Sequence, residues 1–196
     1  MKIKTLKLIA TGAMLSILAG CIVLSVYPFY TAKDLIFDPG LTGRWLKNGT
    51  TNEFWEFTAD GKNFYLLTTT DDRSTNGFYA HLFRLKQHQF LDLLTTNREE
   101  FDRFQMPVHL ITKFTRNGTN LSLPFMDYGW LAGLLETNSA ALRHIVVPEN
   151  PDDTNSGNMV YLTAETKELQ KFLLKHAADT NAFGAGSLVE LKRASP

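Results

Sequence analysis

Short apolar runs, separated by turn-forming pairs, make up most of the chain from residue 40 onward. Asn-Gly or Asp-Gly pairs stand at residues 48–49, 60–61, 76–77 and 117–118. Such pairs tolerate the positive φ angles of tight hairpin turns. The runs between them are rich in aromatic and β-branched residues and predict an antiparallel meander of strands. We expect these strands at residues 41–46, 53–58, 63–70, 78–85, 89–94, 108–116 and 119–125.

The spacing of apolar positions indicates how these strands are covered. In the strand at 108–116, apolar and polar positions alternate, and Val108, Leu110 and Phe114 share one face. In residues 78–83 both faces are apolar. That pattern is typical of a central strand with the core on one side and a helix or loop on the other.

Two segments show a helical period instead. Asp127 can cap a short helix over 127–136. A second helix is predicted over 164–177, where Leu169, Phe172, Leu173 and His176 recur at helical spacing. An expected strand at 142–147 and an acidic loop at 148–158 lie between the helices, and the last strands are expected at 159–162 and 187–192.

These elements predict one mainly β domain over residues 40–196, with one or two helices. The antiparallel meander forms either a barrel or a strongly bent sheet. A chain of 196 residues, less an N-terminal segment, has room for one domain of ordinary size.

The N-terminal segment predicts export. Residues 1–7 carry three lysines and no acid, residues 8–18 are apolar, and Leu18-Ala19-Gly20-Cys21 follows. We interpret residues 1–20 as a lipoprotein signal peptide and Cys21 as the site of lipid attachment. Residues 21–39 then form the lipidated N-terminus and a tether.

A retained membrane anchor is the alternative. Residues 8–30 contain no charged side chain, and about 20 apolar residues suffice to cross a bilayer. Both interpretations place the domain outside the cytoplasmic membrane, because the lysines stay inside.

Two resemblances rest on particular residues. Leu18–Cys21 resembles the lipobox of bacterial lipoproteins, and further segments resemble a set of uncharacterised bacterial lipoproteins. Gly43-Arg44-Trp45 resembles the Gly-x-Trp signature of lipocalins, which implies an eight-stranded barrel with the tryptophan packed across its closed end. The segments that resemble the lipoprotein set are 27–30, 37–39, 78–82, 90–93 and the predicted helix from 162–165 to 172–173.

Composition excludes some classes of partner and site. Lys+Arg and Asp+Glu both count 20, so the chain lacks the basic excess that nucleic-acid binding requires. Cys21 is the single cysteine, which excludes an intramolecular disulfide and a cysteine-based metal site. We expect no cofactor and no metal.

Candidate catalytic chemistry is limited to histidines and one aspartate. None of His81, His88, His109, His144 and His176 falls in a zinc motif, although His81 and His109 lie on predicted strands and could converge. Asp92 lies within an apolar strand, and we expect it to pair with a base such as Arg84 or to face solvent.

The sequence therefore predicts an exported lipoprotein of the bacterial cell envelope, tethered by acyl chains such as palmitate. Its folded part faces the periplasm or the exterior. We expect a non-enzymatic module that binds a small apolar ligand or associates with an envelope protein. The alternative is a single-pass anchored interaction or structural module with a filled β core. A hydrolase built on His81 and Asp92 comes third.

Overall fold

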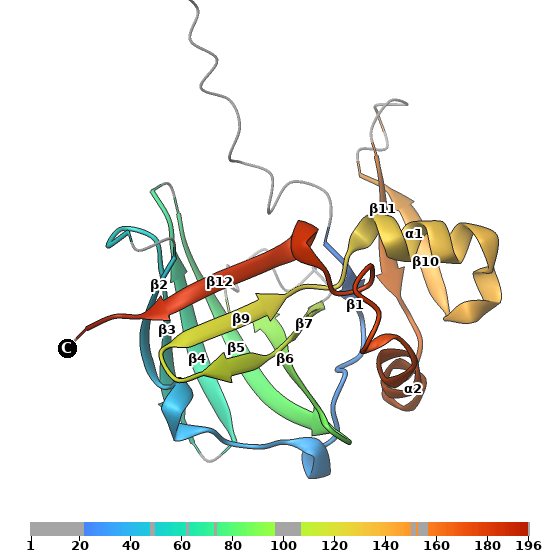
Figure 1. Ribbon diagram of the computed structural model, residues 1–196. Helices are drawn as coiled ribbons and strands as arrows, with labels where there is room; N and C mark the ends of the chain where they lie inside the picture. The colour runs from blue at the N-terminus through green and yellow to red at the C-terminus, as the bar shows by residue number, and fades with distance from the viewer. Residues whose placement is uncertain are drawn as a thin grey trace, which may run out of the picture.

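One strongly curved sheet forms the centre of the fold in the computed structural model (Figure 1). The structure describes residues 22–47, 50–61, 63–72, 74–96, 107–149, 152 and 157–195. The predicted signal peptide 1–20 and Cys21 lie outside these residues.

Within the described ranges, strands join in a 12-stranded sheet of order β10-β11-β1-β7-β6-β5-β4-β3-β2-β12-β9-β8. Strand β1 pairs parallel to β11, and the other pairs are antiparallel, so the sheet is mixed. The strands are β1 Leu24–Ser25, β2 Gly43–Lys47, β3 Phe54–Asp60, β4 Phe64–Thr70, β5 Thr75–Leu85, β6 His88–Thr95, β7 His109–Lys113, β8 Thr115–Asn117, β9 Asn120–Pro124, β10 His144–Pro148, β11 Asn158–Leu162 and β12 Leu188–Arg193.

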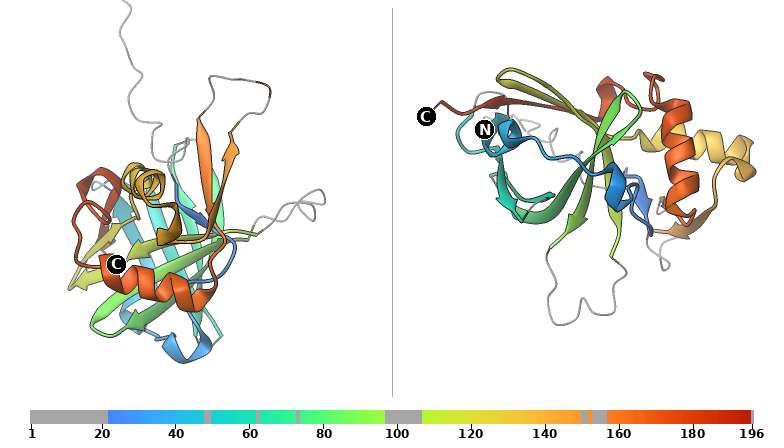
Figure 2. Two further views of the ribbon diagram at one scale, coloured as in Figure 1. Left: turned by 90° about the vertical axis from the view of Figure 1, so that its right-hand side faces the viewer. Right: turned by 90° about the horizontal axis from the view of Figure 1, so that it is seen from below.

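The sheet curls until β12 and β9 lie across from β5, β6 and β7, but it does not close (Figures 1 and 2). The expected barrel is therefore wrong, and the strongly bent sheet is observed. Both edges of β7 are already occupied, by β6 and by β1. A single bridge, Thr112 to Phe125, joins β7 to the chain beyond β9.

The two faces of the sheet pack into separate hydrophobic clusters. The interior cluster lies on the concave side and includes Trp45, Tyr65 and Leu82. The helix-side cluster lies on the opposite face and includes Phe83, Phe90 and the buried residues of both helices. Strands β5 and β6 supply buried residues to both clusters, which confirms the prediction of apolar side chains on both faces of residues 78–83.

The helices cover one face of the sheet, near its β1–β11 end. Helix α1 spans Tyr128–Thr137, and the Asp127 carboxylate accepts a hydrogen bond from Trp130 N at 2.7 Å, as predicted for a cap. Helix α2 spans Thr166–His176 and buries Leu169, Phe172 and Leu173. Short 3-10 turns occupy Ala32–Asp34, Pro39–Leu41, Ser139–Ala141 and Ala185–Ser187. Among the described residues, no helix combines the length and apolarity that a bilayer crossing requires.

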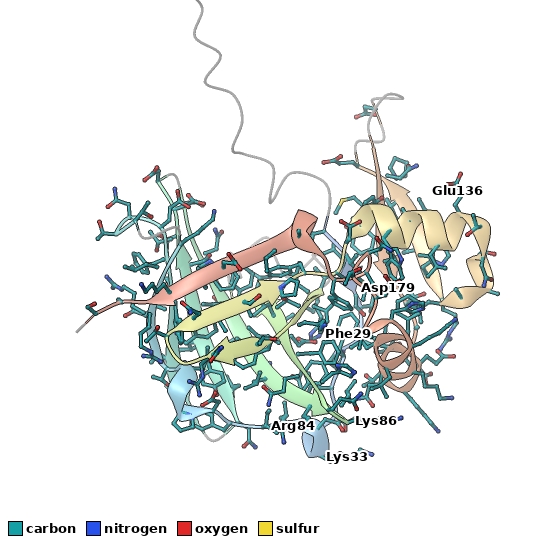
Figure 3. All side chains as sticks on the ribbon, viewed as in Figure 1. Phe29, Lys33, Arg84, Lys86, Glu136 and Asp179 are labelled. Carbon is teal, nitrogen blue, oxygen red and sulfur yellow. The ribbon has the colours of Figure 1, made fainter. Side chains whose placement is uncertain are left out.

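Residues 22–30, here called the N-terminal arm, belong to the folded body. Val23 is 2% exposed and Phe29 is 0% exposed. Figure 3 shows Phe29 in the interior, beside α2. Within the expected tether over 21–39, residues 22–30 are packed into the fold, because their apolar side chains are buried against the sheet and the helices.

Local sequence explains one failed and one successful turn prediction. Asn76-Gly77 lies inside β5 rather than in a turn. The turn comes earlier, where the Asp71 carboxylate accepts a hydrogen bond from Ser74 N at 2.8 Å. Gly118 has a φ of 59° in the β8–β9 turn, as expected for Asn117-Gly118.

Gly43 shows why the Gly-x-Trp segment begins with glycine. Its φ is 115°, and a Cβ there would lie 3.0 Å from Nη1 of Arg193. The Arg193 guanidinium stacks on the buried Trp45 ring, 4.5 Å from its centroid, and Trp45 Nε1 donates to Leu41 O at 2.8 Å.

Candidate functional site

Asp92 is the centre of a buried polar cluster on the helix-side face. It is 0% exposed and stands on β6, where its carboxylate lies 2.7 Å from His109 Nδ1 on β7. In the register, Leu94 is opposite His109, so Asp92 and His109 are diagonal neighbours on one face. The structure therefore pairs Asp92 with a base, but that base is His109. Arg84 is exposed and lies near the β5–β6 turn (Figure 3), so the expected pair with Arg84 is wrong.

The second carboxylate oxygen of Asp92, Oδ2, binds the N-terminal arm. Phe29 N donates to Asp92 Oδ2 at 3.0 Å, across 63 residues of chain. Gln170 of α2 donates to Phe29 O at 3.2 Å, so both backbone groups of Phe29 are bonded. Burial of a carboxylate costs free energy unless its oxygens are paired, and these contacts pair both of them.

His81 faces the same carboxylate from β5, directly opposite Asp92 in the register. Its ring is stacked between Tyr30, at 4.7 Å, and Phe64, at 5.5 Å between centroids. Nδ1 of His81 is buried and has no hydrogen-bond partner among the described residues. Burial lowers the pKa of His81 below its ordinary value of 6.5; Asp92 opposes this shift, and His109 adds to it.

Tyr30 completes the cluster from the end of the arm. Burial, and secondarily the nearby Asp92 charge, raise the pKa of its phenol from 10.0 to about 12. The phenol therefore stays protonated at neutral pH. His81 and His109 do converge, as the sequence allowed, around one acid and two aromatic rings.

The Asp92–His109 contact resembles half of a Ser-His-Asp triad, in which the acid binds the histidine through Nδ1. Ser25 lies opposite His109 in the β1–β7 register. However, Ser25 is 0% exposed, and its hydroxyl donates to Tyr27 O at 2.8 Å. With His109 only 8% exposed, the cluster is closed to a substrate in this conformation.

The remaining histidines occupy separate positions. His176 packs its ring against Trp130 and Phe172, and burial lowers its pKa. His88 lies at the start of β6, and His144 Nδ1 lies 2.8 Å from Leu142 O. Over the described part of the chain, no three His, Cys, Asp or Glu side chains gather closely enough to hold a metal ion.

The concave side of the sheet is filled by side chains. Trp45, Tyr65, Leu82 and Leu91 are all 0% exposed there. One groove lies over strands β2, β12, β9 and β8, has a volume of about 440 Å³ and is lined by polar and apolar side chains. Its lining consists of Leu46, Thr115, Asn117, Asn120, Leu121, Ser122, Glu190, Leu191 and Lys192.

An apolar surface lies at the opposite end of the sheet, on β1, β11 and β10. Val23, Val160 and Leu162 point toward the helices and are buried. Side chains alternate along each strand, so their neighbours point to the other face. We call that surface the terminal apolar face; it consists of Ile22, Leu24, Ile145, Val147, Met159 and Tyr161.

Sequence reasoning found Asp92, His81 and His109 but missed Tyr30 and Ser25, which belong to the arm. Two signals point to them: the apolar run continues past Cys21, and Asp92 is an acid in an apolar strand that requires a distant donor. The predicted lipid-attachment residue Cys21 lies outside the described residues and immediately precedes the arm.

Comparison with known proteins gives no relative: no family model, no curated protein and no solved structure matches the chain.

Proposed function

We propose that the chain is an exported bacterial lipoprotein, anchored to an envelope membrane by acyl chains on Cys21. Its folded part is a non-enzymatic interaction module with a filled interior. The observation that carries this proposal is the packing of the N-terminal arm into the fold directly after Cys21.

The packed arm weakens the competing anchor. A bilayer-spanning helix over residues 8–30 needs the apolar residues 22–30 within the membrane. In the fold, β1 pairs with β7 and β11, and Phe29 is 0% exposed. Without these residues, the uncharged segment 8–21 falls short of the roughly 20 residues that cross a bilayer core. Anchoring through acyl chains on Cys21 requires no bilayer-spanning stretch of polypeptide. The acyl chains themselves provide the membrane affinity, at about 0.8 kcal/mol for each buried CH₂.

The filled interior favours an interaction module over a small-ligand carrier. A ligand in the manner of the lipocalins, which residues 43–45 resemble, needs free volume on the concave side. Large side chains occupy that volume, with Trp45, Phe57 and Tyr65 at most 1% exposed. Exposed apolar side chains lie instead on β10, where Ile145, Val146 and Val147 are 46%, 52% and 38% exposed. Ile145 and Val147 point to the same face as Tyr161 and Met159, whereas Val146 points to the opposite face. An apolar surface of this kind is typical of contact with a partner or a membrane.

The closed polar cluster gives little support to a hydrolase. Both Asp92 oxygens are engaged in holding His109 and the arm, and the Ser25 hydroxyl is bonded to a backbone carbonyl. The cluster fits a structural role, in which it fixes the residues next to the lipid-attachment site.

Intact mass tests the proposed function. The membrane fraction of cells producing the full chain is analysed for the wild type and for Cys21→Ser. We expect a wild-type chain that begins at Cys21 and carries added acyl mass, and an unprocessed Cys21→Ser chain without it. An unprocessed wild-type chain beginning at Met1 would overturn the lipoprotein proposal.

A further inference from the structure

We propose that the terminal apolar face lies against the lipid bilayer, so that the folded domain sits on the membrane rather than at the end of a tether. This inference rests on the proposed function, because the acyl chains on Cys21 bring the membrane to the face.

The position of the anchor follows from the strand register. Ile22 directly follows Cys21, and Leu24 two residues later is opposite Tyr161, which is in turn opposite Ile145. The face therefore begins at the residue after the lipid-attachment site. Strands β1 and β10 are separated by two inter-strand spacings, about 10 Å, so the whole face lies close to the acyl chains.

The chemistry of the face suits a bilayer. All six side chains are apolar or aromatic, and the tyrosine among them carries its hydroxyl beside Met159 Sδ, at 3.8 Å. Tyrosine is favoured where hydrocarbon meets headgroups. The charges nearest along β10 are Arg143 and Glu149, at the two ends of the strand. The middle of the face therefore carries no charged side chain. At one end of β10, Arg143 forms an ion pair with Glu168 at 2.7 Å.

A protein strand added to the free edge of β10 is the competing occupant. Strand β10 ends the sheet, and Arg143 O and Glu149 N bond toward β11. The alternation of an antiparallel ladder then turns the backbone groups of Val146 outward. The bilayer is favoured because Ile22, the first residue of the face, directly follows Cys21 and is itself bridged to Asp127, which leaves no spacer between the fold and the acyl chains.

The test uses the full chain, acylated in cells and reconstituted into phosphatidylethanolamine–phosphatidylglycerol vesicles. Acylation blocks the thiol of Cys21, so a single introduced cysteine can carry a fluorophore. Val147→Cys and Met159→Cys probe the face, and Leu66→Cys on β4 is the matched control, since Leu66 is 37% exposed and Val147 is 38% exposed. Quenching by doxyl-labelled lipid is compared with quenching by aqueous iodide, and intact mass is measured on the same samples.

We expect the labels at 147 and 159 to be quenched several-fold more by doxyl lipid than the label at 66, and to be shielded from iodide. If acylated protein shows equal iodide quenching at all three positions, the face is in water and this inference fails while the lipoprotein proposal stands. Shielding from iodide without doxyl quenching identifies a protein occupant and also overturns the inference. A mass without acylation overturns the proposed function and this inference with it.

Discussion

Asp92 illustrates how one buried charge can organise a fold. Its two oxygens receive His109 from a neighbouring strand and the backbone of Phe29 from the N-terminal arm. The carboxylate thus joins segments that are far apart in sequence. A buried charge contributes through such specific partners, because its desolvation is offset only when each oxygen is paired.

Replacement of Asp92 by alanine is expected to lower the free energy of unfolding by about 2–6 kcal/mol, because the buried Phe29 N–H and the His109 ring each lose their partner, at about 1–3 kcal/mol each. Urea denaturation gives the value. Amide exchange at Phe29 is expected to accelerate beyond that of the central strands, because its N–H loses its acceptor.

Arg84→Ala is the matched control for this prediction. Arg84 lies on the neighbouring strand and is exposed, so its loss is expected to stay within about 0.5 kcal/mol. Equal losses of unfolding free energy for the two substitutions would show that the contacts of Asp92 with His109 and Phe29 do not stabilise the fold.

At the scale of elements, the N-terminal arm is the unexpected component. Strand β1 contains only Leu24 and Ser25, yet it links β7 to β11 and thereby attaches the β10–β11 hairpin to the main sheet. A strand of two residues forms few hydrogen bonds with its neighbours. The attachment therefore depends on the buried side chains of the arm, above all Val23 and Phe29.

Phe29→Ala is expected to destabilise the fold by about 3–5 kcal/mol, the range for removing a buried aromatic side chain. Phe37→Ala is the control from the following segment, where the ring is 40% exposed and stacks on Tyr65 at 5.0 Å. Thermal and urea unfolding of both variants measure the difference. Similar losses for the two would indicate that the arm is only loosely attached.

At the scale of the whole molecule, one sheet separates two hydrophobic clusters. Strands β5 and β6 contribute buried residues to both, with Leu82 and Leu91 on the interior side and Phe83 and Phe90 on the helix side. Neither cluster can lose these strands without exposing the other. Such sharing of strands favours a single cooperative unfolding transition.

Tryptophan fluorescence can follow each cluster separately. Trp45 and Trp55 report on the interior cluster, and Trp130 reports on the helix-side cluster. In Trp130→Phe and in the double variant Trp45→Phe/Trp55→Phe, we expect the fluorescence midpoint in urea to coincide with the far-ultraviolet circular dichroism midpoint. A helix-side transition at lower urea than the loss of strand signal would show two independent units.

Most local elements could be predicted from the amino-acid sequence. Helix α1 with its Asp127 cap, the apolar stripe of α2 and most strands follow from periodicity and turn chemistry, which act over a few residues. The apolar character of both faces of β5 likewise identified a central strand. The exported, lipid-anchored identity remains a sequence-based prediction that depends on residues 18–21.

The way in which these elements pack together could not be predicted from local patterns. Insertion of β1 beside β7 occupies the edge that a closed barrel would need, and residues 22–30 show no turn or period that predicts this insertion. The partner of Asp92 was equally hidden, because the choice between Arg84 and His109 depends on strand register. Side-chain patterns indicate which residues are buried. Contacts between segments distant in the sequence determine what they pack against, and such contacts bury the residues that follow Cys21 in the core.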